Sequence, residues 1–176
     1  MAYEDGEIYW FDPDPRAIIP LDDRFHIPRS LARKIRQGHY EIRVDTAFRE
    51  VIEACAELGP GRETTWINQD IVEAYTEFHS LGFAHSVETW INGELAGGLY
   101  GVAIGGFFAG ESMFSRISDS SKLALVYLVE RLRRQRFQLL DTQFMTDHLR
   151  QFGTVEIPRR EYKLRLARAL KSRVLF

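Results

Sequence analysis

The chain has 176 residues, of which 45% are hydrophobic and 27% charged, and a formal net charge of −2; these values are typical of one globular domain with a real core. Its single cysteine, Cys55, excludes a disulfide framework and a cysteine-rich zinc site. Because no run is long enough to span a membrane and the first residues lack a signal-peptide pattern, we expect a cytoplasmic protein with no membrane partner.

Residues 1–25 are expected to form an extended arm. The segment Asp12-Pro-Asp-Pro-Arg16 has two prolines in alternation, which exclude a helix. The aromatic residues of the arm, from Tyr9 to Phe11, need a surface on which to pack. A short helix is then predicted to begin near Pro28 and to run to about Gln37, because proline suits a first turn.

Two further helices are predicted before residue 82. A strand over 40–44 leads to a helix over 46–58, with Asp45 as its N-cap. A Gly-Pro-Gly loop follows at 58–62. Apolar residues at helical spacing predict the next helix over 68–81, and the glycine after it ends the helix.

The middle of the chain is predicted to be sheet. Two alternating runs, 84–91 and 94–102, flank Asn92-Gly93, a dipeptide that suits a type I′ hairpin turn. A third antiparallel strand is expected over 107–114.

The remainder is predicted to alternate between helix and strand. An amphipathic helix is expected over 118–136, a strand over 137–143, a helical turn over 147–152 and a basic helix from 157 to about 171. The whole order predicts an α+β fold with a mixed, mostly antiparallel sheet flanked by helices.

Basic residues are concentrated in this C-terminal part. From residue 131 onward there are twelve Lys or Arg against four Asp or Glu. Four arginines, at 131, 133, 134 and 136, crowd one predicted helix end, where cations also complement the helix dipole. Charge alone fits both a phosphate-binding face and a set of solvated helix faces.

Two carboxylates and a carboxamide lie in apolar, strand-like surroundings. Glu111 precedes Met113 and Phe114, and Asp141 and Gln143 follow an apolar strand. A buried carboxylate is costly unless something pairs with it, so such a place suits an amine-bearing substrate. Asp141 and Gln143 are two residues apart, so both are expected on one strand face, where they could hold an amine. The alternative is that each is a solvent-facing residue at a strand end.

Seven collinear motifs carry a resemblance to a known family. They include Gly110-Glu-Ser-Met-Phe-Ser-Arg116, His85-Ser86-Val-Glu88, Gly97-Gly98-Leu-Tyr100 and Glu156-Ile-Pro-Arg-Arg-x-Tyr162. Together they resemble the leucyl/phenylalanyl-tRNA–protein transferases over almost the whole chain. That family moves Leu, Phe or sometimes Met from tRNA to proteins with an N-terminal Arg or Lys, which marks those proteins for degradation by the N-end rule.

The resemblance implies a GNAT-like catalytic domain, here residues 26–176, and specific roles for individual residues. Asp141 and Gln143 match the catalytic pair that positions the acceptor α-amine, and Glu111 matches a glutamate of the same pocket. Trp66 and Tyr75 match aromatics around the aminoacyl-adenosine. The candidates for the apolar side-chain pocket are Leu99, Phe108, Leu125, Leu128 and Leu140.

The partners and alternatives follow from the same resemblance. The tRNA is expected to contact Arg131, Arg133, Arg134, Arg136, Arg159 and Arg160, and no cofactor or metal is expected. Family members have a longer N-terminal domain, of which residues 1–25 are expected to be a remnant. Two alternatives are kept: a non-catalytic binder of tRNA or N-terminal peptides, and an acetyltransferase. The second would want an Arg/Gln-x-x-Gly-x-Gly/Ala turn, which the sequence lacks.

Overall fold

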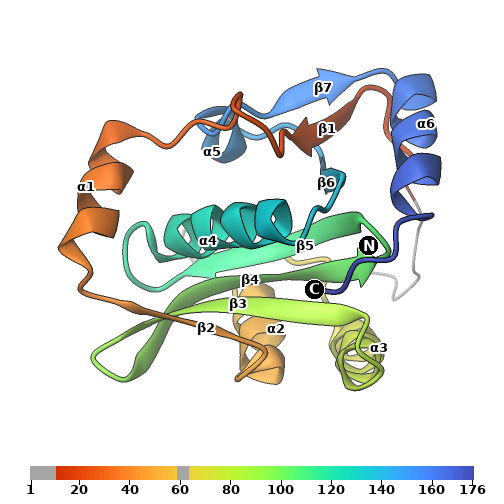
Figure 1. Cartoon of the computed structure of the whole chain (residues 1–176). Coiled ribbons are helices and arrows are strands. Elements are labelled where there is room, and N and C mark those ends of the chain that lie inside the picture. The colour runs from red at the N-terminus through yellow and green to blue at the C-terminus, as the bar shows by residue number, and fades with distance from the viewer. Residues whose placement is uncertain (1–10, 59–63) are drawn as a thin grey trace.

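The protein is a seven-stranded sheet with helices on both faces (Figure 1). The computed structural model describes residues 11–58 and 64–176, so Tyr9, Trp10 and most of the predicted 58–62 loop lie outside the described residues. The strands are β1 (Arg16–Ile19), β2 (Glu41–Val44), β3 (Ala84–Ile91), β4 (Glu94–Ile104), β5 (Phe107–Ser115), β6 (Leu139–Gln143) and β7 (Val155–Ile157). The helices are α1 (Arg29–Gln37), α2 (Phe48–Ala56), α3 (Gln69–Ser80), α4 (Ser120–Arg134), α5 (Asp147–Arg150) and α6 (Arg159–Ala169).

The strand order is β2-β3-β4-β5-β6-β1-β7. Only β5 and β6 pair in parallel among the described strands; every other neighbouring pair is antiparallel. The connection between β5 and β6 is α4, which packs on β3, β4 and β5. The prediction of an α+β fold with a mixed, mostly antiparallel sheet flanked by helices is confirmed.

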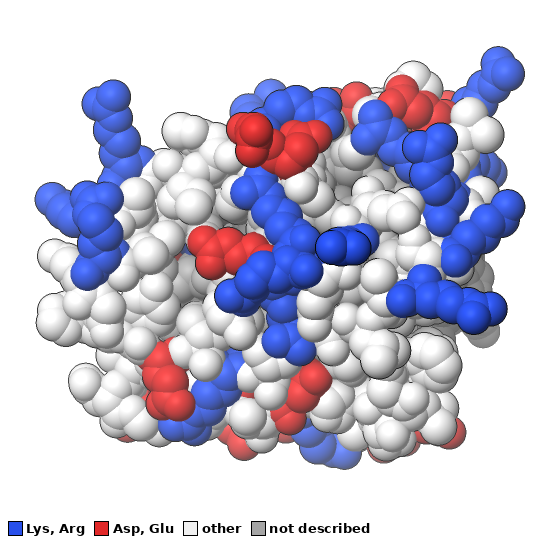
Figure 2. Space-filling model, viewed as in Figure 1, with Lys and Arg blue, Asp and Glu red and all other residues white. Residues whose placement is uncertain are grey.

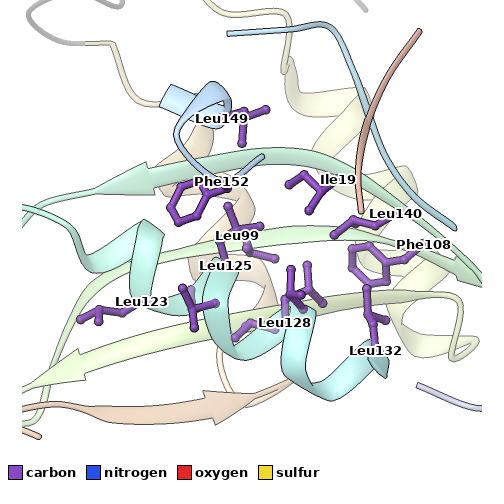
Figure 3. Close-up of a cluster of buried hydrophobic side chains, with 14 of the residues drawn as sticks. Ile19, Leu99, Phe108, Leu123, Leu125, Leu128, Leu132, Leu140, Leu149 and Phe152 are labelled. Atoms are coloured by element: carbon purple, nitrogen blue, oxygen red, sulfur yellow. The ribbon is translucent and has the colours of Figure 1, made fainter. Parts of the chain in front are cut away.

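Two apolar cores cover the two faces of the sheet. α4 buries one face through residues such as Leu125, Leu128 and Leu132, which lie against Phe108 and Leu140 of the sheet (Figure 3). α2 and α3 bury the other face through a second cluster that includes Val51, Ile71 and Tyr100. Helices therefore cover both faces of the sheet.

The predicted hairpin between β3 and β4 is confirmed. Asn92 and Gly93 have φ angles of 54° and 81°, as both central positions of a type I′ turn require.

The predicted cap of α2 was wrong. Asp45 has a φ of 58°, and its carboxylate accepts bonds from the Ser86 backbone and the His85 ring at 2.8 and 2.7 Å. The backbone N–H groups of Thr46 and Ala47 donate instead to the Glu88 carboxylate, each at 3.0 Å. Glu88 is fully buried on β3, so the start of α2 is fixed from the sheet rather than from its own chain end.

Part of the expected arm is an inner strand. β1 pairs with β6 on one side and β7 on the other, as Figure 1 shows at the top of the sheet. Ala17, Ile18 and Ile19 are all buried. Among the described residues, 16–19 belong to the same sheet as the rest of the chain. That residues 1–25 are the remnant of a larger domain stays a prediction.

Candidate active site

A large cleft opens where β5 and β6 separate. These parallel strands pair at only three positions, from Phe107 with Leu139 to Ala109 with Asp141. Beyond that point they diverge, and a cleft of about 1070 Å³ lies between them. Its walls come from α2, α3, β4, β5, α4, β6 and α5, together with Arg16 of β1 and residues of the arm before it. Residues far apart in sequence therefore meet where the sheet splits.

Glu111 is placed in this cleft by a β-bulge. Tyr100 of β4 pairs with Ser112 of β5, while the next residue, Gly101, pairs with Gly110. Glu111 is thus the extra residue of β5, and bulges commonly re-aim a side chain beside an active site. Glu111 lines the cleft. The sequence places this carboxylate in apolar, strand-like surroundings, as a candidate for the substrate pocket.

The surroundings of Glu111 favour its protonated form. Burial, followed by repulsion from Asp141, raises the pKa of the Glu111 carboxyl from 4.5 to about 7. The Tyr75 hydroxyl and the Arg16 guanidinium offset part of this rise. Glu111 can therefore exchange a proton near neutral pH, which is what a group that handles an amine proton needs.

Asp141 lies behind the cleft surface. It has no exposed area and is not among the cleft-lining residues. Its Oδ1 accepts from Arg16 Nε at 3.0 Å and from the Gln143 backbone N–H at 2.9 Å. Its Oδ2 accepts from Arg16 Nη2 at 2.6 Å and from the Tyr162 hydroxyl at 2.8 Å. Since a carboxylate has about four acceptor positions, these donors fill Asp141.

Gln143 reaches the cleft by leaving the strand geometry. Its φ of 59° is in the left-handed region, and Thr142 is an extra residue of β6 opposite the step between Ala17 and Ile18. Alternation of side chains requires an extended backbone, so the expectation of a shared face with Asp141 does not hold. Gln143 lines the cleft, whereas Asp141 touches Gln143 through its backbone.

The cleft has an apolar part and an aromatic part. Four of the five predicted pocket residues line it: Leu99, Leu125, Leu128 and Leu140. Figure 3 shows these four in one cluster with Phe108. Phe108 itself is fully buried and is not a lining residue. Trp66 and Tyr75, predicted beside the aminoacyl-adenosine, also line the cleft.

The predicted tRNA-contacting arginines lie outside the cleft lining and differ in exposure. Arg131 lies 4.7 Å from the centre of the Phe176 ring, and Arg133 donates to the Asp22 carbonyl. Arg134, Arg136 and Arg160 are exposed, and Arg159 is half-buried with its backbone N–H on Asp14. Figure 2 shows Lys and Arg side chains spread over the face that is turned toward the viewer, including the regions of α1 on the left and α6 on the right.

The N-terminus of α4 is already occupied. In the acetyltransferase alternative, free backbone N–H groups at this kind of helix end would bind the diphosphate of the cofactor. Here the N–H of Ser120 donates to Ile117 and that of Ser121 donates to the Ser115 hydroxyl. The Asp119 carboxylate at this end pairs with Lys34 at 2.5 Å and with Lys122 at 2.8 Å. This helix end does not suit an acyl-CoA diphosphate.

Within residues 11–58 and 64–176 there is no group of three His, Cys, Asp or Glu side chains that could hold a metal ion. Over the same residues, no helix has both the length and the apolar character to cross a membrane.

Comparison with known proteins decides the family. The family model for leucyl/phenylalanyl-tRNA protein transferase matches residues 18–167. The chain belongs to this family. A protein of Herpetosiphon aurantiacus named leucyl/phenylalanyl-tRNA–protein transferase is 60% identical over 98% of this chain and 88% of its own length. One of Phenylobacterium zucineum with the same name is 59% identical over 97% of this chain and 77% of its own length. The resemblance expected from the motifs, and with it a transferase, is confirmed.

Solved structures resemble the chain more distantly. A putative GNAT-family acetyltransferase of Desulfovibrio desulfuricans covers 57% of this chain and 70% of its own length, at 16% identity and a TM-score of 0.40. An aminoglycoside N-acetyltransferase in complex with CoA covers 78% of this chain and 93% of its own, at 16% identity and a TM-score of 0.43. The first is named as a member of the fold family predicted from the sequence.

Arg16 and Tyr162 are the functional candidates that sequence reasoning missed. Tyr162 stands inside one of the motifs that carry the resemblance, and Arg16 ends the Asp-Pro-Asp-Pro-Arg16 segment. Neither interrupts an apolar run, which was the signal that singled out Glu111 and Asp141. Arg16 and Asp141 are 125 residues apart. Their pairing follows only from the insertion of β1 beside β6.

Proposed function

We propose that the chain transfers leucine, phenylalanine or methionine from aminoacyl-tRNA to the N-terminal Arg or Lys of acceptor proteins, which marks them for N-end-rule degradation in the cytoplasm. The observation that carries the proposal is the cleft between β5 and β6. It combines an apolar compartment with an ionisable carboxylate and a carboxamide, as an apolar aminoacyl group and a reacting amine together require. Family membership supports the same assignment.

The aminoacyl side chain belongs in the apolar compartment of Leu99, Leu125, Leu128 and Leu140. A pocket of this composition accepts Leu, Phe and Met and leaves charged side chains unsolvated. Trp66 and Tyr75, which line the cleft, are assigned to the terminal adenosine, because a base stacks on aromatic side chains without regard to sequence.

The acceptor amine belongs beside Glu111 and Gln143. In the reaction, the neutral α-amine attacks the ester carbonyl, a new C–N bond forms, and the bond to the ribose oxygen breaks. The amine loses one proton and the departing ribose oxygen gains one, so the step is balanced without a cofactor. Because the ester is already activated, alignment of the two substrates supplies most of the acceleration. Gln143, supported by Asp141, positions the amine, and Glu111 carries the proton.

The charge of Glu111 also suits acceptor choice. In its ionised form, the Glu111 carboxylate at the cleft wall favours a cationic Arg or Lys side chain over a neutral one. The tRNA acceptor stem is assigned to the basic face of Arg131, Arg133, Arg134, Arg136, Arg159 and Arg160. Such binding is mostly phosphate contact, and its affinity falls steeply with salt.

A donor comparison tests this function. A peptide with N-terminal Arg is incubated with the protein and labelled Phe-tRNA, Leu-tRNA, Met-tRNA or acetyl-CoA, and label in the peptide is counted. We expect transfer from the aminoacyl-tRNAs and none from acetyl-CoA. Transfer from acetyl-CoA alone would support the acetyltransferase alternative. Tight tRNA binding with no transfer from any donor would support the non-catalytic one.

A further inference from the structure

The two donors that hold the Asp141 side chain come from opposite ends of the chain. Arg16 belongs to β1 and gives two bonds, to Oδ1 at 3.0 Å and to Oδ2 at 2.6 Å. Tyr162 belongs to α6 and gives one bond, to Oδ2 at 2.8 Å. The Arg16 guanidinium also lies over the Tyr162 ring, 4.6 Å from its centre. Asp141, Arg16 and Tyr162 therefore form one cluster, in which Asp141 and Tyr162 are buried and Arg16 is half-buried; we call it the Asp141 clamp.

The remaining bond of Asp141 leads to the cleft. Its Oδ1 accepts from the backbone N–H of Gln143, the residue with a left-handed φ of 59°. A residue other than glycine holds such a conformation only where the surroundings fix it. Asp141 supplies this bond only while its carboxylate keeps one orientation. The clamp sets that orientation, and the turn then presents the Gln143 side chain to the cleft.

The clamp orients the Asp141 carboxylate in addition to any effect on the stability of the fold. A buried ion pair seldom stabilises a fold more than apolar residues of the same volume would. Its presence beside the proposed reaction site therefore indicates that it orients a side chain. Bidentate pairing by arginine fixes the plane of a carboxylate as well as its position. The Arg16 guanidinium also lies at the cleft surface and offsets the effect of Asp141 on Glu111.

We propose that Arg16 and Tyr162 are positioning residues of the transfer reaction, which act through Asp141 on the turn that carries Gln143. This inference rests on the proposed function. It concerns how the acceptor amine is aligned and predicts that damage to the clamp slows the reaction while donor binding is kept.

The variant Tyr162→Phe tests the clamp with the least disturbance, because it removes only a hydroxyl and keeps the ring under Arg16. We expect kcat for Phe transfer to fall about tenfold, since a hydrogen bond to a charged group is lost. KM for Phe-tRNA should stay within about twofold. Arg16→Lys keeps the charge but loses the fork, and a larger fall of about 30-fold is expected. Tyr40→Phe, at a tyrosine outside the cleft and the clamp, is the matched control.

Coupling to Gln143 separates positioning from a general structural role. If Tyr162 acts through Gln143, then Tyr162→Phe should slow the Gln143→Ala enzyme by less than about twofold, because the two effects share one route. Multiplicative losses, or a fall in kcat equal to that of the Tyr40→Phe control, would overturn the inference.

Hydrogen exchange gives a readout that does not depend on activity. The Gln143 amide should exchange about tenfold faster in Tyr162→Phe than in the unchanged protein, while amides of α2, on the other face of the sheet, keep their rates. Unchanged exchange at Gln143, or faster exchange throughout the sheet, would overturn the clamp. Absence of transfer by the unchanged protein would refute the proposed function instead, and the exchange rates would still decide on the clamp.

Discussion

The ionisation of Glu111 predicts that one substitution changes stability and activity in opposite directions. Glu111→Gln keeps the size of the side chain and removes its charge. In the folded chain the charged form is disfavoured by burial and by Asp141, which raise the pKa of this carboxyl from 4.5 to about 7. The unfolded chain has no such environment, so it keeps a pKa near 4.5.

The sign of the effect on stability follows from this difference. Between pH 4.5 and about 7 the folded chain holds a proton that the unfolded chain has lost, so the free energy of unfolding falls as pH rises. Each unit of pKa difference is worth about 1.4 kcal/mol, which gives an upper bound of about 3 kcal/mol above pH 7. Because the side chain lines an open cleft, solvent screening reduces this to about 1–2 kcal/mol.

Thermal unfolding at about pH 5 and about pH 8 measures this difference. Glu111→Gln should gain about 1–2 kcal/mol more at the higher pH than at the lower one, or roughly 2–8 °C in Tm for a chain of this size. The same variant should transfer Phe more slowly, because no group is left to take the amine proton. Glu94→Gln, at the exposed end of the β3–β4 hairpin, should show no such gain. A gain that is equal at both pH values, or larger at pH 5, would refute the reasoning.

Three further predictions concern other parts of the molecule. Asp141→Asn should slow transfer by roughly 10²–10³-fold, as loss of a well-placed charge does, and should lower Tm; transfer at the unchanged rate in a single-turnover assay would refute its role. Glu88→Ala leaves two backbone N–H groups at the start of α2 without their acceptor, and should cost about 1–3 kcal/mol in urea unfolding with transfer unchanged at low temperature; equal stability would contradict the capping role. Arg134→Ala with Arg136→Ala should weaken Phe-tRNA binding and reduce the log–log salt slope by somewhat under about one unit per contact; an unchanged slope would show that these exposed arginines only solvate a helix end.

The sequence predicted the parts of the fold that depend on local pattern. The hairpin at Asn92 and Gly93 follows from turn chemistry, and the helix after Asn68 follows from the spacing of its apolar residues; both are present. β1 was missed because three apolar residues between Arg16 and Pro20 are too few to distinguish a strand from an extended arm. The α2 cap was assigned wrongly because Glu88, which makes it, lies 41 residues from Ala47.

The same distinction holds for the site. Glu111, Asp141 and Gln143 could be selected from the sequence, because polar groups in apolar strands need a reason to be there. Their distinct roles could not be derived, because bulges at Glu111 and Thr142 decide which side chain meets the cleft. Bulges have no clear sequence pattern, and the alternation rule gave Asp141 and Gln143 the same face.

The central claim is that the cleft joins an aminoacyl group to a free N-terminal amine. The most direct measurement is transfer of labelled Phe from Phe-tRNA to three peptides that differ only at the first residue: Arg, N-acetyl-Arg and Ala. Our account predicts rapid labelling of the Arg peptide, slow labelling of the Ala peptide and none of the acetylated one. Labelling of the acetylated peptide, or no labelling of the Arg peptide, would contradict it.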